Sequence, residues 1–162
     1  MAPGRAALGL LFLLGSLTVL PCLAAAQAFP GESFNSEAER RLAEMLNQSR
    51  GQQGLPPLHV DGHLSAAARE HSRMMAEHDQ LSHQLPGEGN LSRRLRDSQV
   101  TFISAGENID SGKGWLQAHA AFMASAPHRA NILDDDYESV GIGVVERHGT
   151  YWITEDFARL VH

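Results

Sequence analysis

The sequence contains almost no cysteine and no excess of positive charge, and each shortage excludes a class of protein. Cys22 is the only cysteine among 162 residues, so the chain cannot build the disulfide framework that holds many small secreted domains together. The 13 Lys and Arg residues are outnumbered by 19 Asp and Glu residues, which gives a formal net charge of -6. Because binding to phosphate backbones depends on clustered positive charge, we expect no nucleic-acid partner.

Two motifs of hydrolytic enzymes are also missing. The HExxH pattern of helix-borne zinc proteases does not occur, since neither His71 nor His78 is followed by glutamate. The sequence has no GxSxG elbow, and the chain after residue 28 has no thiol that could act as a nucleophile. The sequence therefore contains no motif that supports a helix-borne zinc protease, a serine hydrolase or a cysteine hydrolase.

The first residues have a long apolar run. Residues 6–26 are nearly all apolar, they follow the positive charge of Arg5, and small residues come after them. This is the layout of a secretory signal peptide, and the small residues allow cleavage after Ala28 or after Ala26. We predict a signal peptide over residues 1–28 and a secreted or periplasmic protein. An uncleaved anchor is the alternative, because the run is long enough to cross a bilayer.

The rest of the chain has the length of one domain. Residues 29–162 can bury well over half of their unfolded surface in a single core, and no internal repeat or low-complexity tract divides them. Residues 29–35 contain Pro and Gly without periodicity. We predict a mobile lead-in over residues 29–35, followed by one domain over residues 36–162.

Apolar periodicity predicts helices in the first two thirds of the domain and a hairpin at its end. The spacing of Ser36 and Glu39 is that of a capping box, and Asp61 can cap a second helix. Pro127 is expected to end the third helix, and His148-Gly149 separates two strand candidates. The predicted helices are 36–50, 62–77, 91–97 and 115–125, and the predicted strands are 99–103, 139–146 and 150–158.

This order of elements indicates an α+β fold, in which helices pack on an antiparallel sheet. The stretch from Gln80 to Gly106 is predicted to be mostly loop, and a loop of this length in a compact domain usually carries function or disorder. Its arginines, Arg93, Arg94 and Arg96, are interpreted as a solvated face because acidic residues dilute their charge.

Histidine and carboxylate side chains close to predicted turns are candidate site residues. His83 follows the second helix, Glu107 follows the long loop, and His128 follows the third helix. Imidazole and carboxylate are zinc ligands, and two His with one carboxylate and a water form a known catalytic arrangement. As an alternative, Glu107 accepts backbone N–H groups and pairs with His128 for stability alone, while Asn108 caps a turn.

Short fragments follow one another in a characteristic order over nearly the whole mature chain. They include Leu46-Asn47 with Arg50, Gly54-Leu55, Ala67-Ala68-Arg69, His71-Ser72, Ser82-His83, Gly106-Glu107-Asn108-Ile109, His128-Arg129, Asn131-Ile132-Leu133 and Val140-Gly141-Ile142-Gly143. Together they resemble the bacterial branch of the CAP family, also called the SCP domain, which includes cysteine-rich secretory proteins, antigen 5 and pathogenesis-related proteins. The resemblance implies an α-β-α sandwich with a central antiparallel sheet flanked by helices.

The resemblance also implies a surface cleft. Members of the family often place two His and two acidic residues there, with divalent metals, and the matching positions here are His83, Glu107 and His128. The second acid is missing, because its position falls near Ser125. Three ligands plus water remain adequate for zinc, and Ser125 and Asn108 complete the predicted cleft.

Two functions follow from the resemblance. Members are associated with lipids, sterols, cell-wall material and other proteins, so the first function is a monomeric binding or interaction module outside the cytoplasm, with an unknown ligand. The second is a zinc-dependent hydrolase in which the three ligands hold the ion and a bound water attacks. An enzyme would need a further acid or base near the ion, and the candidates are the position of Ser125 and, if the second helix faces the cleft, His71.

Overall fold

The computed structural model describes residue 1 and residues 32–161. The predicted signal peptide, apart from Met1, lies outside the described residues, together with both cleavage sites and residues 29–31 of the lead-in. None of the helices in the described part of the chain is long and apolar enough to cross a membrane.

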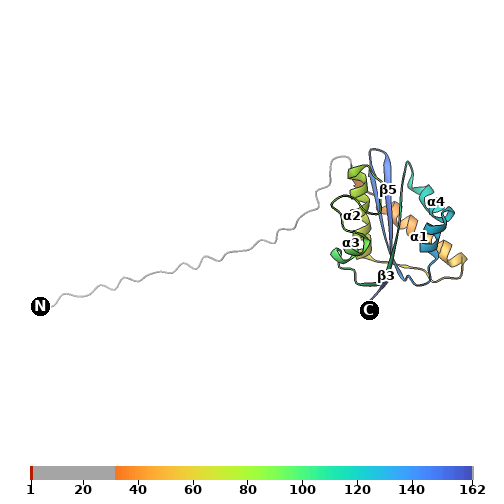
Figure 1. The fold of residues 1–162 in the computed structure, drawn as a ribbon, viewed down its shortest axis with the longest axis horizontal. Coiled ribbons are helices and arrows are strands. Elements are labelled where there is room, and N and C mark those ends of the chain that lie inside the picture. Colours follow the sequence, from red (N-terminus) through yellow and green to blue (C-terminus); the bar gives the residue numbers. More distant parts are fainter. Residues whose placement is uncertain (2–31, 162) are drawn as a thin grey trace.

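A central sheet has helices on both faces (Figure 1). Its strand order is β1-β4-β5-β3, and β2 also pairs with β4. All pairings are antiparallel except that of β2, which runs parallel to β4. The strands are β1 (Glu32–Phe34), β2 (His59–Val60), β3 (Phe102–Gly112), β4 (Ser139–Arg147) and β5 (Thr150–Leu160).

The helices form two layers that enclose the sheet. In Figure 1, α2 and α3 lie on one side of the strands, and α1 and α4 lie on the other. This arrangement confirms the predicted α-β-α sandwich. The helices are α1 (Ser36–Gln52), α2 (Gly62–His78), α3 (Leu91–Asp97), α4 (Ala118–Ala124) and α5 (Ala126–Leu133), with a 3-10 turn, η1 (Trp115–Gln117), before α4.

The helix starts follow local capping chemistry, with one difference from the prediction. Asp61 caps α2 as predicted, since its Oδ1 accepts from the N–H groups of His63 and Leu64. The cap of α1 is Asn35, whose Oδ1 accepts from the Ala38 N–H, and not Ser36. The last residues of the predicted lead-in are therefore ordered, as β1 and as a helix cap.

The C-terminal hairpin confirms the prediction from His148-Gly149. These two residues have φ values of 52° and 72°, which is the pair of positive angles that a type I′ turn requires. The turn joins β4 to β5, and β5 occupies an interior position in the sheet with β3 on its other side. Helices cover both faces of β5, so its middle residues are buried on both sides.

Two predicted boundaries are wrong. The segment that contains Glu107 is not a loop end but the middle of β3, which pairs with β5 along its full length. This pairing is a long-range interaction. The polar residues and glycines of the segment are not typical of a strand, so its composition did not indicate the pairing. Pro127 does not only follow a helix end: it lies in the first turn of α5, where the missing N–H of proline costs no hydrogen bond.

Candidate functional site

The two polar residues of the Gly-Glu-Asn segment point to opposite faces of the sheet. Glu107 is paired with Asp156 of β5, and Asn108 is paired with Glu155. Because side chains alternate along a strand, Glu107 and Asp156 face the layer of α2 and α3. Asn108 and Glu155 face the layer of α1, α4 and α5. The strand therefore contributes to two separate polar clusters.

Glu107 is a buried carboxylate with a partially exposed histidine on top of it. Its Oε1 accepts a hydrogen bond from His83 Nδ1 at 2.8 Å, and its Oε2 forms an ion pair with the Arg94 guanidinium. The Glu107 side chain is 4% exposed and the His83 side chain is 60% exposed. The structure thus brings together two of the predicted site residues, and His83 is the member that solvent can reach.

Arg94 is the central cation of this cluster, which corrects its interpretation as part of a solvated face. Its side chain is 6% exposed. Besides the ion pair with Glu107, its NH1 donates to the carbonyl groups of His83 at 3.0 Å and Gly89 at 3.3 Å. One guanidinium therefore joins α3, β3 and the two ends of the 83–89 segment.

A second His–Glu pair lies beside the first. His71, which is fully buried on α2, donates from Nδ1 to Glu88 Oε1 at 2.7 Å, and its Nε2 lies 3.6 Å from Glu107 Oε2. Burial alone would raise the pKa of Glu88, but the bond from His71, the Leu85 N–H and the charge of Arg94 bring that pKa below its ordinary value. The second helix therefore does face the cluster, through His71.

Asp156 completes this side of the sheet. It is fully buried, and its pKa lies well above the ordinary value because burial and then the negative charge of Glu107 disfavour ionisation. This carboxyl group lies next to Glu107 across the strand pair. Glu107 is thus surrounded by one acid, one guanidinium and two imidazoles.

On the opposite face, Asn108 links three elements and does not cap a turn. Its Nδ2 donates to the carbonyl of His128 and to Glu155 Oε2, both at 3.1 Å. Asn131 of α5 donates from Nδ2 to Asn108 Oδ1 at 2.9 Å and to the Glu107 carbonyl at 3.2 Å. These hydrogen bonds of the two side-chain amides hold α5 against the edge strand β3.

His128 belongs to this second cluster. It lies on α5, where its ring packs edge-on against Phe122 with the centroids 5.2 Å apart. Burial raises the pKa of the nearby Asp110, and the Ser111 N–H and then His128 offset part of that rise. Glu155 is fully buried here, and burial raises its pKa to about 8.

The residues predicted to bind zinc do not form a fitting donor set. Both oxygens of Glu107 are already engaged by His83 and Arg94, and a guanidinium in contact with the carboxylate would repel a divalent cation. His128 lies in the other helical layer. Among residue 1 and residues 32–161, no group of three or more His, Cys, Asp or Glu side chains could hold a metal ion.

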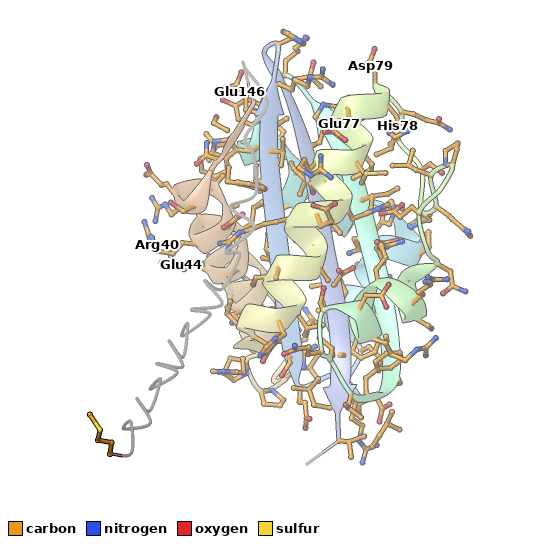
Figure 2. The ribbon with its side chains drawn as sticks, turned by 90° about the vertical axis from the view of Figure 1, so that its left-hand side faces the viewer. Arg40, Glu44, Glu77, His78, Asp79 and Glu146 are labelled. Atoms are coloured by element: carbon orange, nitrogen blue, oxygen red, sulfur yellow. The ribbon has the colours of Figure 1, made fainter. Side chains whose placement is uncertain are left out.

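Ser125, which was predicted to complete the cleft, lies outside the clusters, and so does His78. Ser125 separates α4 from α5, and its side chain makes no capping bond there. His78 is exposed at the C-terminal end of α2, where Nδ1 bonds the Met74 carbonyl at 2.9 Å. Figure 2 labels His78 at this helix end, together with its chain neighbours Glu77 and Asp79.

Sequence reasoning missed five members of the clusters, Glu88, Arg94, Asn131, Glu155 and Asp156. The sequence held one indication that Arg94 is buried. Arg94 lies three residues after Leu91 and next to Leu95, and this spacing places it near the apolar face of a short helix. The adjacent acids of β5 follow Ile153-Thr154 in a strand-like run. No local pattern showed that both faces of this strand are covered.

Comparisons with known proteins give a consistent result. The cysteine-rich secretory protein (CAP) family matches residues 43–157. YkwD of Bacillus subtilis (strain 168) is 36% identical over 123 residues, which are 75% of this chain and 47% of that protein. An extracellular protein containing a SCP domain from Bacillus anthracis str. Ames has a crystal structure with a TM-score of 0.71 and 29% identity, over 76% of this chain and 40% of that one.

An outer surface protein from Borrelia burgdorferi has a TM-score of 0.75 over 80% of this chain and 98% of that chain. At 18% identity this similarity shows the fold alone. The chain spans less than half the length of the two Bacillus proteins.

Proposed function

Since the chain belongs to the cysteine-rich secretory protein (CAP) family, we propose that it is a binding module that works outside the cytoplasm and contacts its ligand through His83. The N-terminal apolar run supports export, and the extracellular Bacillus anthracis relative is consistent with it. The proposed ligand is cell-wall material or a lipid surface.

The observation that carries the proposal is the exposed imidazole on a buried carboxylate. Nδ1 of His83 is held by Glu107 at 2.8 Å, so the ring is oriented and its Nε2 is left for an outside partner. Arg94 bonds the His83 carbonyl and so restrains the backbone as well. A ligand group meets a preorganised contact, which lowers the entropy cost of binding.

A metal-dependent hydrolase is the less supported function. It requires His83, Glu107 and His128 around one ion, whereas Glu107 is paired with Arg94 and His128 packs on Phe122. Isothermal titration of the purified protein with zinc chloride tests this alternative. Stoichiometric zinc that disappears in both His83→Ala and His128→Ala would restore the hydrolase.

The test of the binding module is co-sedimentation of the purified protein with isolated bacterial sacculi and, separately, with phosphatidylglycerol–phosphatidylcholine vesicles. We expect sedimentation with one of the two surfaces and a loss of at least about fivefold in His83→Ala, because one oriented polar contact is worth about 1 kcal/mol or more.

His78→Ala is the matched control, since it also removes an exposed histidine of the same region that makes one local bond. It should sediment like the wild type. Sedimentation with neither surface, or equal binding by His83→Ala, would contradict the proposal.

A further inference from the structure

The strand β3 forms one edge of the sheet and has no partner strand on its outer side. The strand order β1-β4-β5-β3 places it at the end, and within residues 32–161 its ladder is with β5 alone. In Figure 2 it is the pale green strand at the right of the sheet. The opposite edge differs, because β1 and β2 both pair with the outer side of β4. The protein thus covers one edge of its sheet with short strands and leaves the other edge open to a further strand.

The hydrogen bonds around β3 show which of its main-chain groups point outward. The C=O of Ala158 in β5 points toward the start of β4, since it accepts from the Glu138 N–H at 3.1 Å. Residues of an antiparallel pair alternate between bonding the neighbouring strand and pointing away from it. Ala105 lies opposite Ala158, so Ala105 and every second residue after it point outward. The C=O of Glu107 agrees with this, because it accepts from Asn131 Nδ2 at 3.2 Å.

These outward groups are unpaired and the main chain around them is accessible. Among the hydrogen bonds of residues 32–161, none uses the N–H groups of Ala105, Glu107 and Ile109. Gly106 has no side chain and is partly exposed. Glu107 is 8% exposed as a residue but its side chain is only 4% exposed, so most of its exposed surface is main chain. Residues 102–112 contain neither proline nor lysine, which commonly protect a free edge.

We propose that the outer edge of β3 binds an extended segment of a partner protein, which adds a strand to the sheet. Successive outward N–H groups on a strand are two residues, or about 6.8 Å, apart, and each has a C=O group beside it. An extended polypeptide carries acceptors and donors at the same spacing. A glycan or an acyl chain has no such row of amides and would leave the edge unpaired. The inference goes beyond the proposed function, because the partner is a polypeptide.

Charge favours a segment that carries basic and no acidic side chains. The chain has a formal net charge of -6, and β3 itself contains Glu107 and Asp110. Pairing with β3 of a second copy would bring these acids of both copies into one ladder, and like charges on neighbouring strands are destabilising. A lysine-containing segment avoids that repulsion, so a different protein fits this edge better than a second copy does.

The experiment is a ¹H–¹⁵N NMR titration of the purified protein with the peptide acetyl-Lys-Val-Thr-Val-Thr-Val-Lys-amide. The control peptide has the same side chains but carries N-methyl groups on its three central residues, which removes donors along both of its edges. We expect saturable shifts of the Ala105, Glu107 and Ile109 amide resonances with the first peptide. The methylated peptide should bind at least about fivefold more weakly, because the main-chain hydrogen bonds are lost.

Ala105→Pro removes one edge donor from the protein. Proline is tolerated in an edge strand where the replaced N–H points to solvent, and Ala105 points away from β5, so the ladder between β3 and β5 is retained. We expect at least about fivefold weaker binding of the unmethylated peptide. Ala105→Val keeps the N–H and is the matched control, which should bind like the wild type. If Ala105→Pro does not fold by circular dichroism, the comparison of the two peptides on the wild-type protein decides the question.

Equal binding of the methylated peptide, or no shift at β3, overturns the inference. Shifts of Ile142 in place of the β3 resonances do the same, because Ile142 faces the opposite edge between β1 and β2. If the β3 resonances shift with protein concentration when no peptide is present, the edge belongs to a second copy and the inference is wrong. Sedimentation with sacculi or vesicles is measured separately, so a negative titration rejects this inference and leaves the proposed function standing.

Discussion

Glu155 is a carboxyl group that the fold holds in its neutral form. It lies on the central strand β5 with no exposed surface, and its one bond is the 3.1 Å contact from Asn108 Nδ2 to Oε2. Burial and the nearby charge of Asp110 raise its pKa to about 8, from an ordinary value of 4.5. The native state therefore binds a proton in this range that the unfolded state releases.

Glu155→Gln tests this protonation state, because glutamine mimics the neutral acid. Since the native state binds more protons, the wild-type unfolding free energy should fall as pH rises from 4.5 toward about 8. The contribution of one group is about 1.4 kcal/mol per pH unit. Urea unfolding across this range should show a slope less steep by about that amount in the variant, while Glu37→Gln, at an exposed site, should keep the wild-type slope.

At this scale the sequence predicts which residues matter better than it predicts their partners. His83 and Glu107 were predicted together and are in contact at 2.8 Å. His128 was predicted with them, but strand alternation places its neighbour Asn108 on the other face of the sheet. The face depends on whether the segment is a strand, and the loop-like composition of the segment concealed this.

The contact between α2 and β4 depends on two glycines. A Cβ atom on Gly141 would lie 2.1 Å from the Leu64 carbonyl carbon, and one on Gly143 would lie 2.3 Å from the Arg69 backbone nitrogen. Real Cβ atoms do not approach backbone so closely, and backbone cannot move aside as a flexible side chain does. The Gly-x-Gly spacing thus sets how near the helix lies to the sheet.

Gly143→Ala should therefore lower the unfolding free energy by about 3 kcal/mol or more, because α2 must move away from the strand. The control is Gly51→Ala in α1, where nothing lies within 4 Å of the added carbon, and the change should stabilise by about 0.5–1 kcal/mol. Thermal and urea unfolding of both variants measure this. A Gly143→Ala variant as stable as the wild type would contradict the close packing.

Arg50 connects three segments in the helical layer that contains α1, α4 and α5. It is fully buried, and its guanidinium donates to the carbonyls of Pro56, Ile132 and Asp134 at 2.7–2.9 Å. These bonds join the last turn of α1 to the segment before β2 and to the end of α5. The side chain therefore holds these elements together.

Arg50→Met should cost about 3 kcal/mol of unfolding free energy, since it leaves buried carbonyl groups without donors. Arg41→Met on the exposed side of the same helix loses only a surface pair with Glu44 and should change stability by less than about 1 kcal/mol. The urea unfolding midpoints of the two variants, compared at one pH, measure this difference. Similar midpoints would mean that water satisfies the three carbonyl groups when the guanidinium is removed.

Elements whose signals are local were predictable, whereas those held by distant pairing were not. The Asp61 cap and the His148-Gly149 turn set α2 and the hairpin from a few adjacent residues. The strand β3 depends on β5, about fifty residues later in the chain, for its hydrogen bonds, so composition within the segment did not indicate it.

Across the whole molecule, buried groups act on stability in opposite directions as pH changes. Glu155 and Asp156 have raised pKa values because of burial, and they weaken the fold as pH rises. His119 has a pKa lowered by burial from 6.5, so it weakens the fold as pH falls below 6.5. The lowered pKa of Glu88 makes its contribution disappear only as pH falls below 4.5.

These signs predict that the protein is more stable in mildly acidic solution than at pH 8. Between pH 6.5 and about 8, His119 no longer contributes, and Glu155 loses its proton only on unfolding; the raised pKa of Asp156 acts with the same sign. The unfolding free energy should therefore decline over this interval, by up to about 1.4 kcal/mol per pH unit for each group. Urea unfolding of the wild type and of Glu155→Gln/Asp156→Asn measures it, and the double variant should show a much flatter profile because its amides cannot ionise. A wild-type stability that rises from pH 6.5 to 8 would mean that Glu155 is ionised in the folded protein.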